Sequence, residues 1–132
     1  MLVLAMLGLG CAKPAGPPAI ELGTECASCS MAVSDLRFAC ERSTEKDWHV
    51  YDSIECLLRD NDATGAIALA DYDTKSLHMA DSLWVVHGSF PSPMGGGYAA
   101  FSERAAADTI AMRTHGEVAR IARFLALAER RP

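Results

Sequence analysis

Apolar and polar side chains alternate along residues 36–43, LRFACERS, and this period of two predicts a half-buried strand. A polar turn separates it from residues 48–51, WHVY, whose β-forming side chains predict a second strand. The apolar period then lengthens in DSIECLLRDND, which predicts a helix with Asp52 or Ser53 as its N-cap. A short apolar run over residues 66–73 predicts a third strand.

The second half of the chain follows the same order. Residues 83–90 and 98–101 predict two strands, and the loop between them, PSPMGGG, is dense in turn formers. Residues 102–116 predict a helix that Ser102 caps and Gly116 ends. Residues 117–130 fit either a short strand or a last amphipathic helix. Because YDS and FSE each lead from a strand into a helix, the two halves predict a weak internal duplication.

The N-terminus has the character of an export signal. In MLVLAMLGLGC, ten apolar or glycine residues precede Cys11, whereas a bilayer span needs about twenty. Small residues that run into a cysteine, followed by a Pro/Gly linker, resemble a bacterial lipoprotein signal truncated at its start. We expect a signal peptide at 1–10, a lipid-anchored linker at 11–23 and a folded domain at 24–132. A cleaved secreted protein and an uncleaved anchor are the alternatives.

This signal predicts that the protein is lipidated at Cys11 and lies in the bacterial cell envelope, facing the periplasm or the cell exterior.

Composition fits one soluble domain, because 132 residues with 50% hydrophobic and 22% charged side chains supply one modest core. A net charge of −5 and the lack of a basic stripe argue against nucleic acid. The sequence has no phosphate loop, dinucleotide fingerprint or catalytic triad, so we do not expect an enzyme.

Cysteine chemistry is the main functional signal, and several interpretations fit it. Cys26 and Cys29 form a C-x-x-C pair, as in thiol-disulfide oxidoreductases, but they follow a linker rather than a strand. Together with Cys40 and Cys56 they supply four thiols, enough for a structural zinc site or for two disulfides. Cys40 and Cys56 are also suited to plain burial, because a free cysteine packs like a small hydrophobe.

A soft-metal site is the remaining interpretation. Cu(I) prefers thiolate and thioether ligands. If the segment around Ser30 is extended, Cys29 and Met31 point the same way and face one ion. Met94, in a tight loop, is the candidate third donor, and a histidine ligand stays open. By contrast, we expect the two remaining methionines of the folded domain, Met79 and Met112, to lie in the core.

The order of these motifs resembles the NosL family of lipoprotein copper chaperones, which serve nitrous oxide reductase. C-x-x-C-S-M, WHVYDSIECLL, ALADYDT and SPMGGGYAAF follow the pattern of that family over most of residues 24–116. The resemblance implies that the folded domain is a NosL-like copper-binding domain with Cu(I) as its cargo. It also implies that Cys29 and Met31 are the copper hook, with Cys26 as the partner cysteine and Met94 as the methionine of the loop.

The resemblance further implies an α+β fold of two small ββαβ-like units, with mixed sheets and packed helices. The expected partners are a membrane surface and a copper-receiving metalloenzyme or its assembly complex, as in nitrous oxide reductase maturation. Ser30 replaces the usual glycine of the family, and Ser92 replaces a common threonine. Cys40 and Cys56 have no role in this copper site.

Overall fold

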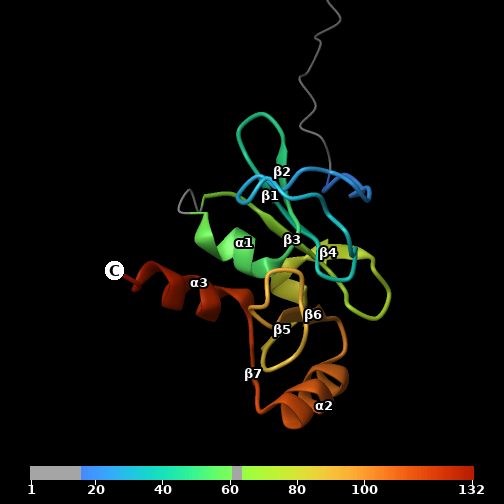
Figure 1. The fold of residues 1–132 in the computed structure, drawn as a ribbon, viewed down its shortest axis with the longest axis vertical. Coiled ribbons are helices and arrows are strands. Elements are labelled where there is room, and N and C mark those ends of the chain that lie inside the picture. The colour runs from blue at the N-terminus through green and yellow to red at the C-terminus, as the bar shows by residue number, and fades with distance from the viewer. Residues whose placement is uncertain (1–15, 61–63) are drawn as a thin grey trace, which may run out of the picture.

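Two antiparallel sheets follow one another along the chain in this computed structural model, which describes residues 16–60 and 64–132 (Figure 1). The first sheet has the order β2-β1-β3-β4, and its strands are β1 (Cys40–Ser43), β2 (Trp48–Tyr51), β3 (Ile67–Ala70) and β4 (Leu77–Met79). The second has the order β6-β5-β7, with β5 (Trp84–His87), β6 (Tyr98–Phe101) and β7 (Glu117–Ala119). The helices are α1 (Ile54–Arg59), α2 (Arg104–Thr114) and α3 (Ile121–Glu129), and a 3₁₀ turn, Ala80–Ser82, joins the sheets.

The predicted α+β class and the repeated order of elements are confirmed. Each half runs strand, strand, helix, strand, and in each the first strand is central, with the other two on either side. The sheets were expected to be mixed, but all pairs of named strands are antiparallel. The reason is that β2 and β3, which α1 connects, run in the same direction but have β1 between them.

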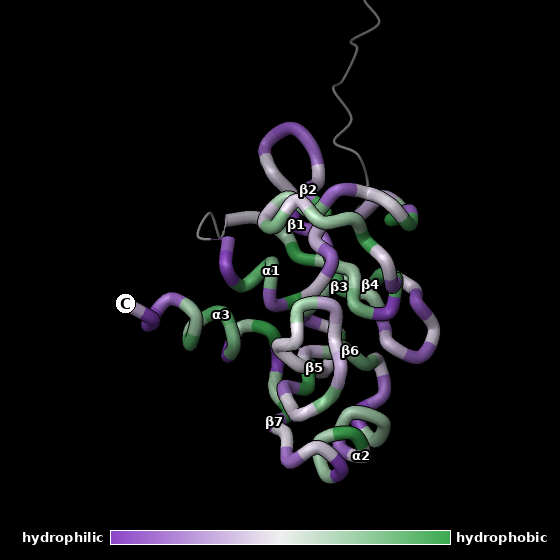
Figure 2. The backbone as a smooth tube through the Cα atoms, viewed as in Figure 1, coloured by the Kyte–Doolittle hydropathy of each residue, from purple (hydrophilic) through white to green (hydrophobic). Residues whose placement is uncertain are grey.

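Several element boundaries differ from the prediction. The first strand begins only at Cys40, because residues 36–38 form a turn in which Arg37 donates from its backbone and guanidinium to Asp35. β4 was not predicted. The ambiguous C-terminal stretch contains both alternatives, β7 and then α3. Figure 2 shows the turn between β1 and β2 as hydrophilic, as expected from its sequence.

The core forms where α1 packs on the inner face of the first sheet. Ser53 is the N-cap of α1, as predicted, and its hydroxyl accepts from the Cys56 backbone N–H. Ile54 and Leu57 are buried in one cluster with Cys40 and Tyr51. Burying a side chain such as Leu57 stabilises the fold by about 1.5–3 kcal/mol.

The C-terminal helix closes the same core from the second half of the chain. Phe124 of α3 is buried and packs edge-on against Tyr98, with ring centroids 5.6 Å apart. Tyr98 in turn stacks on His87 at 4.1 Å. Within the described residues, every helix is too short or too polar to cross a membrane. The expected signal peptide and Cys11 lie outside the described residues.

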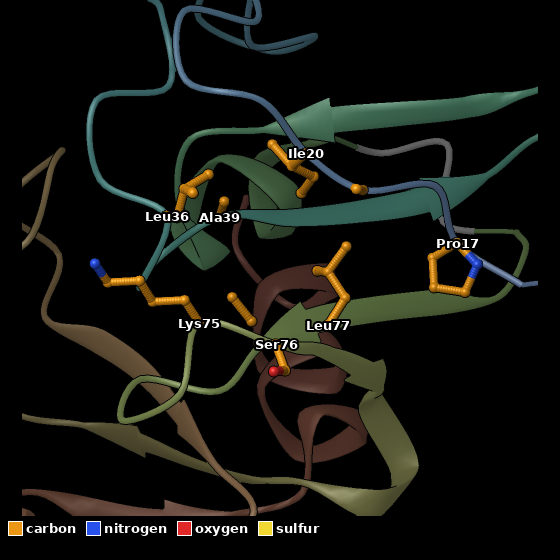
Figure 3. A pocket seen from close by; sticks show the side chains of 9 residues that line it. Pro17, Ile20, Leu36, Ala39, Lys75, Ser76 and Leu77 are labelled. Atoms are coloured by element: carbon orange, nitrogen blue, oxygen red, sulfur yellow. The ribbon is translucent and has the colours of Figure 1, made fainter.

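The segment that enters the domain crosses the outer face of the first sheet, opposite α1. A groove of about 370 Å³ remains between this segment and the sheet. Figure 3 shows Ile20 of the entering segment opposite Leu77 of β4, with Lys75 at one end of the groove. Pro17, Ala19 and Ile20 line the groove from the entering segment, which leads on to the hairpin that carries Cys26 and Cys29.

Asp71 joins the two sheets. This buried carboxylate, just after β3, accepts hydrogen bonds from the backbone N–H and the hydroxyl of Ser102, just after β6. Tyr72 N–H also donates to the Ala100 carbonyl at 2.8 Å. Ser102 was predicted to cap α2, but Glu103 precedes the helix without a side-chain cap bond. The Ser102 side chain is engaged by Asp71 instead.

We predict that Asp71→Ala lowers the free energy of unfolding by about 2–4 kcal/mol, because it removes a buried carboxylate that accepts hydrogen bonds from Ser102 and from the backbone N–H of Asp73. Burial alone would raise the pKa of Asp71, but hydrogen bonds, first from Ser102, hold it below its usual value. The contribution of the ionised Asp71 carboxylate to the free energy of unfolding is therefore complete above the unfolded-state pKa of about 3.9. It is lost as pH falls through the folded-state pKa. Denaturant unfolding measures the effect, with the exposed Asp73 as Asp73→Ala control. Equal stabilities of both variants would contradict the role of Asp71.

Glu41 of β1 is buried on the outer face without hydrogen-bond partners for either carboxylate oxygen within the described residues. Its cross-strand neighbours are Val50 and Ala68. Burial raises the pKa of Glu41 from 4.5 to about 7. The protonated carboxyl is therefore the form that the fold accommodates.

We predict that Glu41→Gln stabilises the protein by about 2–3 kcal/mol near pH 8, where the buried wild-type carboxylate is charged. Near pH 3.5, Glu41 is protonated in the folded state and largely so in the unfolded state, and the two proteins should differ little. The raised pKa makes stability fall as pH rises between about 4.5 and 7. Unfolding curves at both pH values test this, with the exposed Glu45→Gln as control. A gain that does not depend on pH would disprove the assignment.

Candidate metal centre

A hairpin before β1 carries Cys26 and Cys29. Its arms meet at a bridge between Glu25 and Ala32, and the Cys26 N–H donates to the Met31 carbonyl at 2.8 Å. The Ala27 N–H donates to the Val50 carbonyl at 2.8 Å, which fixes the hairpin to the edge of the first sheet. Cys26 is thereby buried, whereas Cys29 stays partly exposed.

The tip of this hairpin is a tight turn and not the extended segment that was expected. Ser30 has a φ of +63°, in the left-handed region, and its N–H donates to the Cys26 carbonyl at 3.0 Å. Strand-like alternation therefore does not align Cys29 with Met31. Cys29 packs against the core, and Met31 is 54% exposed. The left-handed backbone also gives a physical reason for the glycine that the NosL pattern has at the position of Ser30.

Three thiols and one carboxylate meet beneath the hairpin. The sulfurs of Cys26, Cys29 and Cys56 and a carboxylate oxygen of Asp52 all lie within 4.8 Å of one another. Asp52 and Cys56 come from the corner between β2 and α1, and both are buried. One oxygen of Asp52, Oδ1, has no hydrogen-bond partner among the described residues. Such a set of soft sulfur donors with one buried acid can hold a metal ion.

Two thiols of this cluster, Cys29 and Cys56, have raised pKa values. Burial raises the pKa of Cys56, and a hydrogen bond to Asp52 raises it further. Burial also raises the pKa of Cys29, although the Met31 backbone N–H opposes this by donating to the sulfur. A redox-active cysteine is usually a thiolate with a lowered pKa at the start of a helix. Residues 27–29 form a turn, so the arrangement does not favour a thiol oxidoreductase.

Cys40 lies near these thiols but is not part of the four-ligand group. It is fully buried, and its Sγ donates to the Ser53 carbonyl at 3.4 Å. This is the plain burial expected for Cys40. The four described cysteines are free thiols, so the structure contains neither of the two disulfides that one alternative requires.

Met94 lies half-buried in the loop between β5 and β6 and packs against the same core cluster as the thiols. The loop lies close to α1, since a Cβ on Gly96 would overlap the carboxylate of Glu55. Two other expectations for methionine were wrong: Met79 is 39% exposed on the edge strand β4, and Met112 is 80% exposed on α2. Both side chains therefore lie at the surface of the domain and not in its core.

Sequence reasoning missed Asp52 as a candidate ligand, since it was considered only as a helix cap. Cys56 was considered as one of four thiols of a zinc site, as a disulfide partner or as a buried thiol, but it was given no role in the copper site. The available signal was that both residues flank the Ser53 cap, at the corner where β2 leads into α1. The group contains no histidine within the described parts of the chain.

Fold and cluster together define an α+β domain with a candidate soft-metal centre. No protein-family model and no curated protein matches the sequence. Among solved structures, the copper chaperone NosL from Shewanella denitrificans is similar, with a TM-score of 0.68 and 19% identity. The match covers 82% of this chain and 94% of that chain. At this level of identity the likeness shows a shared fold.

We predict that Ser30→Gly stabilises the domain by about 0.5–1 kcal/mol, since glycine adopts a positive φ without strain. Ser28, in the same turn, has no positive φ, so Ser28→Gly should destabilise by a similar amount through lost chain entropy. Thermal unfolding of the metal-free proteins measures both. Stabilisation by both substitutions, or by neither, would contradict the assigned backbone geometry.

Proposed function

We propose that this protein is a Cu(I)-binding chaperone and not an enzyme. The observation that carries the proposal is the gathering of three thiols within 4.8 Å, in a fold similar to that of a copper chaperone. Copper is the cargo. The resemblance to the NosL family implies that Cys29 and Met31 are the copper hook and that Cys26 or Met94 completes the site.

The chemistry of the donors supports Cu(I). Thiolate and thioether are both soft ligands, which match a soft monovalent ion. Cys29 is suited to transfer because it belongs to the buried cluster and is itself partly exposed. Met31, two residues further on, offers an exposed thioether, a neutral ligand that exchanges more readily than a thiolate. The Met31 sulfur is therefore the ligand that we propose for an ion leaving the cluster.

Delivery completes the proposed function. The acceptor is a copper-receiving metalloenzyme or its assembly complex, and nitrous oxide reductase maturation is the setting that the resemblance implies. We further propose that residues 1–10 are a signal peptide and that a lipid on Cys11 and the following linker tether the domain to the envelope membrane. An acyl anchor would hold the domain at the membrane surface on its periplasmic or external side.

A structural zinc site is a second candidate. The buried carboxylate of Asp52 beside three thiols favours it, because zinc binds three cysteines and one oxygen ligand in a tetrahedral arrangement. The two metals differ in what they need. Zinc gains nothing from Met31, whereas a copper carrier uses its thioether.

We predict that Cys29→Ala weakens Cu(I) binding by about 100-fold or more, equivalent to about 2.7 kcal/mol. Anaerobic competition with a chromogenic Cu(I) chelator measures the affinity. Met31→Ala should slow copper transfer from the loaded protein to the chelator by about tenfold, because the exchange ligand is lost. Met112→Ala is the matched control, since Met112 is exposed and lies on α2, outside the thiol cluster.

Unchanged affinity in Cys29→Ala, together with unchanged transfer in Met31→Ala, would exclude the copper function. Tight binding of Zn²⁺ by the wild-type protein and equal behaviour of Met31→Ala would favour the structural zinc site instead.

A further inference from the structure

Cys56 lies at a position where a thiol can be both buried and precisely oriented. It belongs to the first turn of α1, and its backbone N–H is held by the Ser53 hydroxyl at 3.4 Å. The side chain is fully buried, and its sulfur lies in one group with those of Cys26 and Cys29 on the hairpin. The cluster is thus built from two separate segments of the chain.

The spacing of the three sulfurs suits one ion. Metal–thiolate bonds of about 2.3 Å place three sulfurs about 4 Å apart around a trigonal centre. The sulfurs of Cys26, Cys29 and Cys56 lie within 4.8 Å of one another, so small side-chain movements close the set. Asp52, with its unpartnered and buried Oδ1, adds an oxygen donor beside the three sulfurs.

Cys40 shows that burial alone does not bring a thiol into this group. Cys40 and Cys56 are both fully buried in the same core cluster. The Cys40 sulfur donates to the Ser53 carbonyl and lies outside the four-ligand set, whereas the Cys56 sulfur lies inside it. The two residues therefore form a natural matched pair for an experiment.

We propose that Cys56 is a copper ligand, so that the protein holds Cu(I) in an inner site of three sulfurs, those of Cys26, Cys29 and Cys56. This inference rests on the proposed function, since it takes Cu(I) as the cargo. Cys29 remains bound while the ion moves outward. In that step the bond from copper to the Cys56 sulfur breaks and a bond to the Met31 sulfur forms.

The exchange is balanced without a redox partner. Copper stays monovalent, and the Cys56 sulfur keeps its electron pair and takes a proton from water. Release therefore restores the thiol, and loading displaces its proton to solvent.

The test compares Cys56→Ser with Cys40→Ser in the full chain, loaded anaerobically with one equivalent of Cu(I). X-ray absorption at the copper edge counts the sulfur ligands, and chelator competition gives the affinity. We expect three sulfurs in the wild-type and Cys40→Ser proteins and two in Cys56→Ser. The affinity of Cys56→Ser should fall by about tenfold or more, equivalent to about 1.4 kcal/mol, with little change in Cys40→Ser.

Thermal unfolding of the metal-free variants separates a ligand effect from a folding defect. If Cys56→Ser fails to fold, Cys56→Ala, which places no hydroxyl in the core, takes its place in the sulfur count. Three sulfurs with unchanged affinity in the Cys56 variant would overturn the inference. The proposed function would then still stand if Cys29→Ala loses copper, and it would fall only if Cys29→Ala binds copper as the wild type does.

Discussion

The buried carboxylate of Asp71 accepts hydrogen bonds from Ser102 and so fixes the end of β3 to the end of β6. Each sheet has only three or four short strands and an apolar face that must be covered. Once joined, the halves share a core that contains Leu57 and Leu69 from the first and Tyr98 and Phe124 from the second. The thiol cluster lies on this shared core, so its geometry depends on the joint.

Two local backbone features then position the sulfurs. The left-handed residue Ser30 reverses the chain so that Cys26 turns inward and Cys29 stays near the surface. The cap at Ser53 starts α1 and places Cys56 in its first turn, and the Cys56 sulfur joins the same cluster. Neither feature involves a metal, and the cluster is therefore largely formed by the fold itself. Such preorganisation lowers the conformational cost of binding an ion.

Local patterns in the sequence predicted most of the elements, because strand alternation, helix spacing and the Ser53 cap act over a few residues. The same reasoning could not place Cys26 next to Cys56, thirty positions apart, since that contact depends on how the hairpin crosses the edge of β2. It also assigned Ser102 to a helix cap, because a hydroxyl before a helix gives no sign of a competing buried acid. The extended reading of residues 29–31 failed for a related reason, as a serine gives little warning of a positive φ.

The corner between the second strand and the helix occurs twice, and its two copies have diverged in use. In the first copy, Asp52 follows Tyr51 and faces sulfur. In the second, Ser102 follows Phe101 and donates to Asp71, which joins the two halves. The second corner is thus needed for the structure of the domain, whereas the side chains of the first corner are free to vary. New ligand specificities should accordingly be easier to engineer at Asp52 than at its counterpart.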